Sequence, residues 1–377
     1  MSAEPRTQES SKVAAAPEAP GVLPAQALRA MLAQGQITTA APLAEGQIQP
    51  ASLDLRLGDT AWRVRASFLA GRGRSVAERL ADFEMHRMDL SGGAVLERGC
   101  VYVVPLAEGL ALPGDVHAVA NAKSSTGRLD LLTRVITDGG EEFDRVAPGY
   151  KGPLYAEICP RSFSVLVRPG MRLNQIRFRR GRAVLGDAEL TALHARERLV
   201  SGAAHISEGL GFSVDLRAAE PGGIVGFRAR PHAGVIDLDR IGGYDPADYW
   251  DELRAPEGRL ILDPGAFYIL VSRESVHIPP DYAAEMAPYL AMVGEFRVHY
   301  AGFFDPGFGH DAAGGAGARG VLEVRCHEAP FALEHGQIVG RLVYERMSAR
   351  PEALYGAGIA SHYQGQGLKL SKHFRKP

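Results

Sequence analysis

The fold is decided by two matching stretches of sequence, LERGCVYVVPLAEGLALPGD at Leu96–Asp115 and LDPGAFYILVSRESVHIPPD at Leu262–Asp281. They lie 166 residues apart, share one apolar pattern and both end in Pro-x-Asp. The same offset places Glu157 on Glu323 and Gly170 on Gly336. Between these anchors the register is lost and then recovered, as expected of two copies of one domain with different loops.

Short apolar stretches separated by Gly and Pro predict strands. Alternation of leucines with polar residues predicts one of them at 53–57. The others are expected at 101–105, 116–120, 163–167 and 174–178. Apolar residues at helical spacing predict short helices at 24–34 and 75–87, and the stretch 190–196 is expected to be a short helical or loop connection. The sequence therefore predicts an all-β barrel or sandwich with a few short helices.

The 377 residues of the chain are enough for two domains. An Ala-, Pro- and Glu-rich start predicts a disordered tail, and a charged Ala/Leu stretch predicts a connection between the copies. The expected division is a disordered tail at 1–20, a first domain at 21–182, a connector at 183–209, a second domain at 210–350 and a C-terminal tail at 351–377.

Composition excludes several classes of protein. Lys and Arg number 42 against 44 Asp and Glu, so a nucleic-acid partner is disfavoured. The three cysteines have neither a disulfide pattern nor zinc-site spacing. No apolar run reaches the ~20 residues that span a membrane. Without a visible secretory signal, a cytoplasmic location is expected.

A cluster that suits phosphate lies in the first copy, at Lys123–Arg128. It reads KSSTGR, with two cations, three hydroxyls and a glycine in six residues. Phosphate oxygens require such donors. The second copy has the apolar sequence PYLAMVG there, at Pro288–Gly294. A polar surface turn is the alternative interpretation, and the difference between the copies favours a phosphate site.

Two acids belong to the second copy. Asp305 opens an Asp-Pro-Gly turn, and Glu323 lies on a strand of otherwise apolar residues. A carboxylate in such a strand costs free energy unless it is paired or used. Each copy therefore holds half of a composite site, formed within one chain or between chains. Glu157, which matches Glu323 in the first copy, is the rival candidate for the catalytic acid; its alternative role is a structural ion pair. Asp54 and Arg56 are interpreted as a structural ion pair with each other.

Together these motifs resemble the dCTP deaminase family. Lys123–Arg128 is similar to its Arg-Ser-Ser-x-x-Arg motif, although Lys123 replaces an arginine. Ala301–Phe308 is similar to its Ala-x-x-x-Asp-Pro-Gly-aromatic motif. The remaining resemblances are Gln49–Gly58 to its N-terminal signature, Val321–Glu323 to its catalytic strand, and His362–Gln366 to its closing tail.

The resemblance implies two tandem dUTPase-like domains, each a distorted jelly-roll or β-barrel, in a homo-oligomer. It implies dCTP as substrate and dTTP as a feedback ligand. It makes Glu323 the group that transfers protons. The nucleotide-binding residues that it implies are Lys123, Ser124, Ser125 and Arg128 for phosphates, Ala301 for the cytosine amino group, Asp305 and Phe308 for the sugar, and Tyr363, Gln364, Gln366 and Lys369 in the closing tail.

The expected reaction is hydrolytic deamination of dCTP to dUTP. Zinc deaminases carry His-x-Glu and Pro-Cys-x-x-Cys, which this sequence lacks. We therefore predict no zinc, and Mg²⁺ only as companion of the triphosphate. The alternatives are a dUTP diphosphatase, an enzyme that does both steps, and a non-catalytic regulator that binds deoxynucleoside triphosphates.

Overall fold

The computed structural model describes residues 19–218, 220, 222–288, 296–299, 302–356, 365 and 367–376, with backbone only for 288 and 296–299. The prediction of a mostly β chain with short helices is confirmed. The elements of the first half are β1 (Gly21–Val22), α1 (Ala25–Ala33), β2 (Ile37–Thr39), β3 (Leu53–Arg56), β4 (Thr60–Val64), α2 (Val76–Phe83), β5 (Glu84–Asp89), β6 (Ala94–Leu96), β7 (Val101–Ala111), β8 (Val116–Ala122), α3 (Ser124–Gly127), β9 (Leu131–Thr137), β10 (Arg145–Val146), β11 (Lys151–Pro160), β12 (Val165–Val167) and β13 (Arg172–Arg180).

The second half follows the helix α4 (Asp187–Arg196), which lies inside the segment predicted to connect the copies. Its elements are β14 (Leu210–Ser213), β15 (Gly226–Ala229), β16 (Ile236–Asp237), η1 (Pro246–Asp248), β17 (Trp250–Leu253), β18 (Arg259–Leu262), β19 (Phe267–Val276), β20 (Tyr282–Pro288), β21 (Phe296–His299), β22 (Phe303–Phe304), η3 (Asp311–Ala313), β23 (Ala318–Cys326), β24 (Phe331–Glu334) and β25 (Ile338–Arg346).

Strand pairing repeats between the halves. The order β3-β13-β8-β10 in the first half corresponds to β14-β25-β20-β22 in the second. Likewise β5-β4-β7-β11-β9 corresponds to β17-β15-β19-β23-β21, and β6-β12 to β18-β24. Strands β7 and β19 begin at Val101 and Phe267, and β8 and β20 at Val116 and Tyr282, so each pair keeps the 166-residue offset. One pattern of apolar residues thus forms the same set of sheets twice.

The predicted helix at 75–87 is too long. Helix α2 begins after Ser75, whose side chain accepts from the Glu78 amide as a helix cap, and it ends at Phe83. From Glu84 the backbone pairs with β4 instead. Hydrogen bonding to the edge of β4 therefore determines the conformation of Glu84–Asp89, in spite of its helical spacing of apolar residues.

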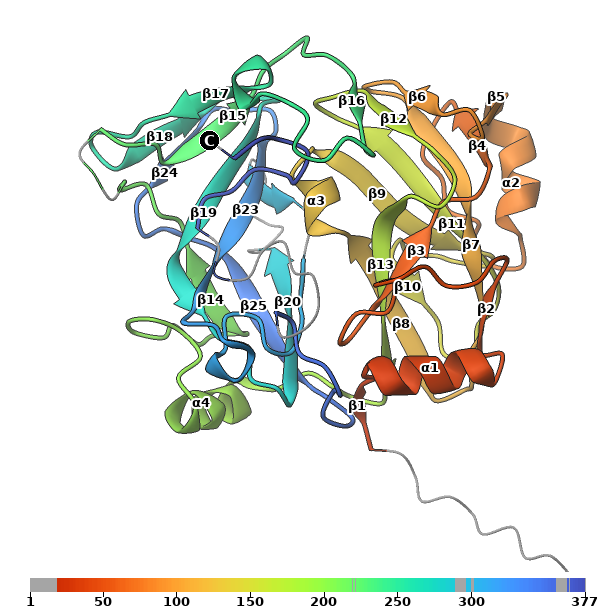
Figure 1. The fold of residues 1–377 in the computed structure, drawn as a ribbon, viewed down its shortest axis with the longest axis horizontal. Helices are drawn as coiled ribbons and strands as arrows, with labels where there is room; N and C mark the ends of the chain where they lie inside the picture. Colours follow the sequence, from red (N-terminus) through yellow and green to blue (C-terminus); the bar gives the residue numbers. More distant parts are fainter. Residues whose placement is uncertain are drawn as a thin grey trace, which may run out of the picture.

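The halves pack against each other, with α3 between them (Figure 1). The core of the first half also contains residues of the second, among them Phe227, Ile269 and Val321. Phe163 stacks edge-on against Trp250 with ring centroids 5.4 Å apart. Of the helices in the described ranges, none combines the length and apolar character of a membrane span. This packing brings the end of β8 and the middle of β23 together.

Candidate functional site

Helix α3 and strand β23 bring the two halves of the site into contact within one chain. The helix closes with the Gly127 amide donating to the Lys123 carbonyl at 2.9 Å. Because Gly127 has no side chain, the Glu323 carboxyl lies directly against it. A Cβ built on Gly127 would stand 2.4 Å from Glu323 Oε2 and 2.8 Å from its Cδ. The acid of the second half therefore contacts the predicted phosphate-binding segment of the first, Lys123–Arg128.

Glu323 is buried in this contact, 7 % exposed. The Arg128 guanidinium is near it, with Nε 4.0 Å from Oε1. Burial raises the pKa of the Glu323 carboxyl well above its usual range; Arg128 opposes this rise, and the neighbouring Asp130 adds to it. This upward direction brings the pKa of the carboxyl closer to the range in which acid–base catalysis is effective.

Asp305 lies on the second-half side of the same interface. Its Oδ1 accepts a hydrogen bond from Arg177 Nη2 at 2.9 Å. Burial raises the pKa of Asp305, and the Arg177 guanidinium opposes the rise. The turn requires glycine at 307, because φ there is 95° and a Cβ would meet the Leu354 side chain at 2.8 Å. Phe308 is buried edge-on against Phe304, with ring centroids 5.1 Å apart.

Lys123 begins α3 in an ion pair with Asp54 of β3. Arg172 Nη1 also approaches Asp54, at 3.5 Å. The interpretation of Asp54 and Arg56 as a pair is wrong, since Arg56 Nε binds Glu108 Oε1 at 2.7 Å instead. Residues two apart in a strand share a face, but here each side chain meets a partner on another element. Asp54 therefore pairs with Lys123 of the candidate site and not with Arg56.

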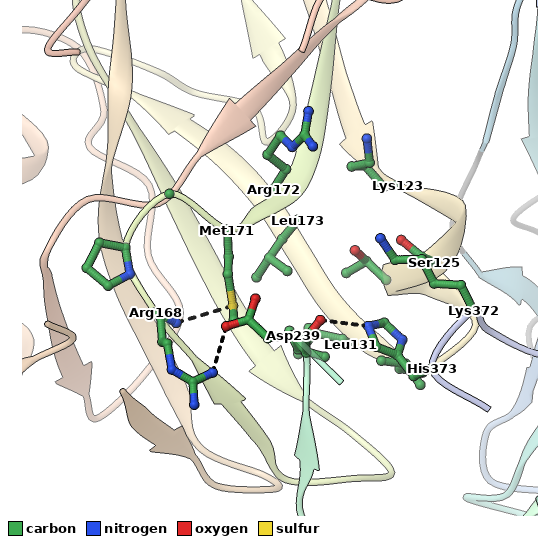
Figure 2. Close-up of a pocket in the computed structure, with 15 residues that line it drawn as sticks. Lys123, Ser125, Leu131, Arg168, Met171, Arg172, Leu173, Asp239, Lys372 and His373 are labelled. Carbon is green, nitrogen blue, oxygen red and sulfur yellow. Dashed lines mark hydrogen bonds and ion pairs between the residues drawn. The ribbon is translucent and has the colours of Figure 1, made fainter. Parts of the chain in front are cut away.

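A pocket of about 400 Å³ opens beside α3 (Figure 2). Its lining comes from α3, the turn between β12 and β13, the loop after β16 and the C-terminal segment (residues 367–376). The charged and hydroxyl-bearing side chains on its wall are Lys123, Ser125, Thr126, Arg168, Arg172, Asp239 and Lys372. Asp239 is bound by Arg168 Nη1 at 2.8 Å.

Lys372 adds a further positive charge to this pocket, beside Lys123, Arg168 and Arg172. The structure contains no ion pair of Lys372 with any carboxylate in the described ranges. Burial lowers the pKa of Lys372, and Lys123 and Arg172 lower it further by repulsion. Three cations that repel one another around one cavity favour a bound anion.

The C-terminal segment is fastened against α3. Ser371 Oγ donates to the Ser125 carbonyl at 2.7 Å, and Arg128 Nη1 donates to the Lys369 carbonyl at 3.1 Å. Phe374 packs edge-on against Trp250, with ring centroids 5.8 Å apart. Of the predicted tail residues, Lys369 is thereby placed beside the phosphate motif. Tyr363, Gln364 and Gln366 lie outside the described residues, as does Ala301.

Glu157, the rival acid, lies in a different setting. It forms an ion pair with Arg134 of β9, and Ser67 Oγ donates to its Oε2 at 2.7 Å. The Arg134 guanidinium in turn covers the Phe143 ring, 3.6 Å from its centroid. Both oxygens of Glu157 are thus engaged, whereas the one ion pair of Glu323 found among the described residues has its cation at 4.0 Å.

Sequence reasoning missed Arg172 and Arg177, and it considered Lys372 only as one of two lysines in the C-terminal tail. Nothing local distinguishes Arg172 from other surface cations, because its role comes from tertiary contact. Arg177 did carry a signal. The 166-residue offset places it on Val343, so one copy has a cation at a position built for an apolar side chain.

Comparison with known proteins gives one consistent result. The family model "2'-deoxycytidine 5'-triphosphate deaminase (DCD) N-terminal domain" matches residues 19–182, and the corresponding C-terminal domain model matches 186–374. A crystal structure of 2'-deoxycytidine 5'-triphosphate deaminase from Agrobacterium tumefaciens is similar with a TM-score of 0.84 and 56% identity, over 87% of this chain and 99% of that one.

Shorter relatives are similar to part of the chain. A protein of Beutenbergia cavernae named "dCTP deaminase, dUMP-forming" is 32% identical over 35% of this chain and 69% of its own length. A dCTP deaminase of Halorubrum lacusprofundi is 30% identical over 41% of this chain and 71% of its own length. Within the described ranges, no group of three or more His, Cys, Asp or Glu is arranged to hold a metal ion.

Proposed function

Because the chain belongs to the 2'-deoxycytidine 5'-triphosphate deaminase family, whose members act on dCTP, we propose that it hydrolyses dCTP to dUTP and ammonia in one pocket shared by its two halves. The observation that carries the proposal is the contact between Glu323 and Gly127 of the phosphate motif. We propose that both halves have the dUTPase-like fold that the family resemblance implies; the repeated strand order supports one common fold for the two halves.

Glu323 carries the proton transfers in this proposal. Water adds to C4 of cytosine and gives one proton to the carboxylate, which passes it to N3. The carboxylate then takes the proton of the new C4 hydroxyl and gives it to the amino group, so the C4–N bond breaks, ammonia leaves and C4 becomes a carbonyl. The pKa of Glu323, raised by burial, suits a group that must both accept and donate within one turnover.

The triphosphate is proposed to bind on the Lys123 side of α3. Lys123 and Ser125 line the cationic pocket, and Ser124 and Arg128 lie at the two ends of the helix. Mg²⁺ would be held by phosphate oxygens, because the pocket wall supplies mainly cations and Asp239 is already bound by Arg168. No zinc is proposed. A homo-oligomer and dTTP feedback remain expectations from the family.

Removal of Lys372 or Arg172 tests this placement. We expect Lys372→Gln and Arg172→Gln each to raise KM for dCTP by ~10- to 100-fold, since each charge-assisted phosphate contact contributes about 1.5–3 kcal/mol. The turnover number should change less. Arg72→Gln is the control, because Arg72 is exposed and pairs with Glu141 away from the pocket. Unchanged KM in both variants would place the triphosphate elsewhere.

The product distinguishes the two catalytic alternatives. The Beutenbergia cavernae relative is named dUMP-forming, so a second step that releases pyrophosphate is the alternative. We expect incubation with dCTP and Mg²⁺ to yield equal amounts of dUTP and ammonia by chromatography and ammonia assay. Accumulation of dUMP with pyrophosphate would instead establish the bifunctional reaction, and dUTP added alone should then also be consumed.

A further inference from the structure

Arg177 crosses from the first half into the second without touching solvent. It belongs to β13, and its relative exposure is 0 %. Its guanidinium donates to the Ala284 carbonyl at 3.0 Å and to the Phe304 carbonyl at 3.3 Å, both in the second half. It lies 4.1 Å from the centroid of the Phe303 ring. A planar guanidinium held by these contacts has one orientation available.

Two carboxylates of the second half meet this guanidinium. Glu345 Oε2 lies 3.2 Å from Nη1, and Asp305 Oδ1 lies 2.9 Å from Nη2. Glu345 has a second cation, because Arg179 Nε lies 2.6 Å from its other oxygen. For Asp305, Arg177 provides the one ion pair found among the described residues. The charge balance of Asp305 therefore depends on Arg177.

The contact with Arg177 involves one of the two carboxylate oxygens of Asp305. Arg177 binds Oδ1, and within the described ranges no hydrogen bond to Oδ2 is found. A buried carboxylate with one oxygen fixed by a guanidinium presents the other in a defined direction. The direction of the second oxygen of Asp305 is therefore set by Arg177, which belongs to the first half, although Asp305 belongs to the second.

We propose that Arg177 is a positioning residue that aims Asp305 at the 3′-hydroxyl of the deoxyribose, so that recognition of the sugar depends on a contact between the two halves. This inference rests on the proposed function, and it adds that Asp305, which the family resemblance assigns to the sugar, accepts a hydrogen bond from that hydroxyl. Arg177 itself touches no part of the nucleotide. Its loss should therefore weaken only the part of binding that passes through Asp305.

The test compares dCTP with 2′,3′-dideoxycytidine triphosphate, which lacks the 3′-hydroxyl. The variants are Arg177→Lys, Asp305→Asn and the double variant. Arg177→Lys keeps a buried cation but loses the planar guanidinium that binds Asp305 and Glu345 together.

We expect the wild type to prefer dCTP in kcat/KM by ~10²-fold, since a site built to bind a hydroxyl rejects an analogue without it. Arg177→Lys should lower kcat/KM for dCTP by ~10-fold and for the dideoxy analogue by less than about twofold. When Asp305→Asn is already present, adding Arg177→Lys should not change the ratio of kcat/KM for dCTP to that for the dideoxy analogue any further.

Each other outcome has a distinct meaning. If Arg177→Lys lowers kcat/KM equally for both nucleotides while wild type discriminates, Arg177 only stabilises the interface and the inference is wrong. If wild type does not discriminate, the proposed role of Asp305 fails and the inference fails with it. Arg180→Lys is the control, because Arg180 lies on the same strand and Arg180 Nε pairs with the exposed Asp115 at 2.7 Å.

Discussion

Glu323→Gln is expected to lower the turnover number for dCTP deamination by about 10³-fold, the usual contribution of a positioned acid–base group. Glutamine keeps the shape of the side chain but can neither take a proton from water nor return one. Binding of dCTP should persist, because the proposed phosphate contacts lie in the pocket beside α3, and Glu323 does not line that pocket. Single-turnover kinetics together with a direct binding measurement would separate the two effects.

Glu157→Gln is the matched control for this experiment. The two glutamates occupy equivalent strands 166 residues apart, β11 and β23. Glu157 is held by Arg134 and Ser67, so we expect the variant to keep near-normal turnover and to lose thermal stability. Loss of turnover at 157 with normal turnover at 323 would reverse the assignment of the catalytic acid.

Gly127→Ala is expected to lower the turnover number by about 10²-fold, because a misplacement of ~1 Å in a catalytic group costs this much. The added methyl group would stand 2.4 Å from Glu323 Oε2, so the carboxyl must move. The change occurs in the first half, while the affected acid belongs to the second. Steady-state kinetics with thermal unfolding as a check on folding would measure it.

Gly114→Ala is the control for that substitution. Gly114 lies between β7 and β8, and a Cβ there would meet no atom within 4 Å. It should therefore leave the turnover number unchanged. Wild-type turnover in Gly127→Ala would show that Glu323 does not need the position in which it is found, and would contradict its role in catalysis.

The parts of the fold that follow from periodic apolar residues were predictable. Alternation at Leu53–Leu57 and the matching stretches around Val101 and Phe267 became strands at those positions. The boundary of α2 was not predictable, because Glu84–Asp89 carries helical spacing and its strand state comes from pairing with β4. Local pattern determines the element type where no distant partner competes.

Some residues of the candidate site could likewise be predicted from their own segment, and others depend on tertiary packing. Lys123–Arg128, Asp305 and Glu323 stand out because each has a residue type that its own segment does not require. Arg172 looks ordinary in sequence. Arg172 and Lys372 lie around the same pocket as Lys123 only through the packing of the C-terminal segment and the β12–β13 turn. The pairing of Asp54 with Lys123, instead of with Arg56, depends on the packing of β3 close to the start of α3.

A crystal structure of the Glu323→Gln variant with dCTP and Mg²⁺ tests the central claim most directly. We predict one nucleotide whose cytosine ring contacts residue 323 of the second half while its phosphates contact Ser124, Ser125 and Arg128 of the first half. A nucleotide bound by residues of one half alone, with residue 323 out of reach of cytosine C4, would contradict the account.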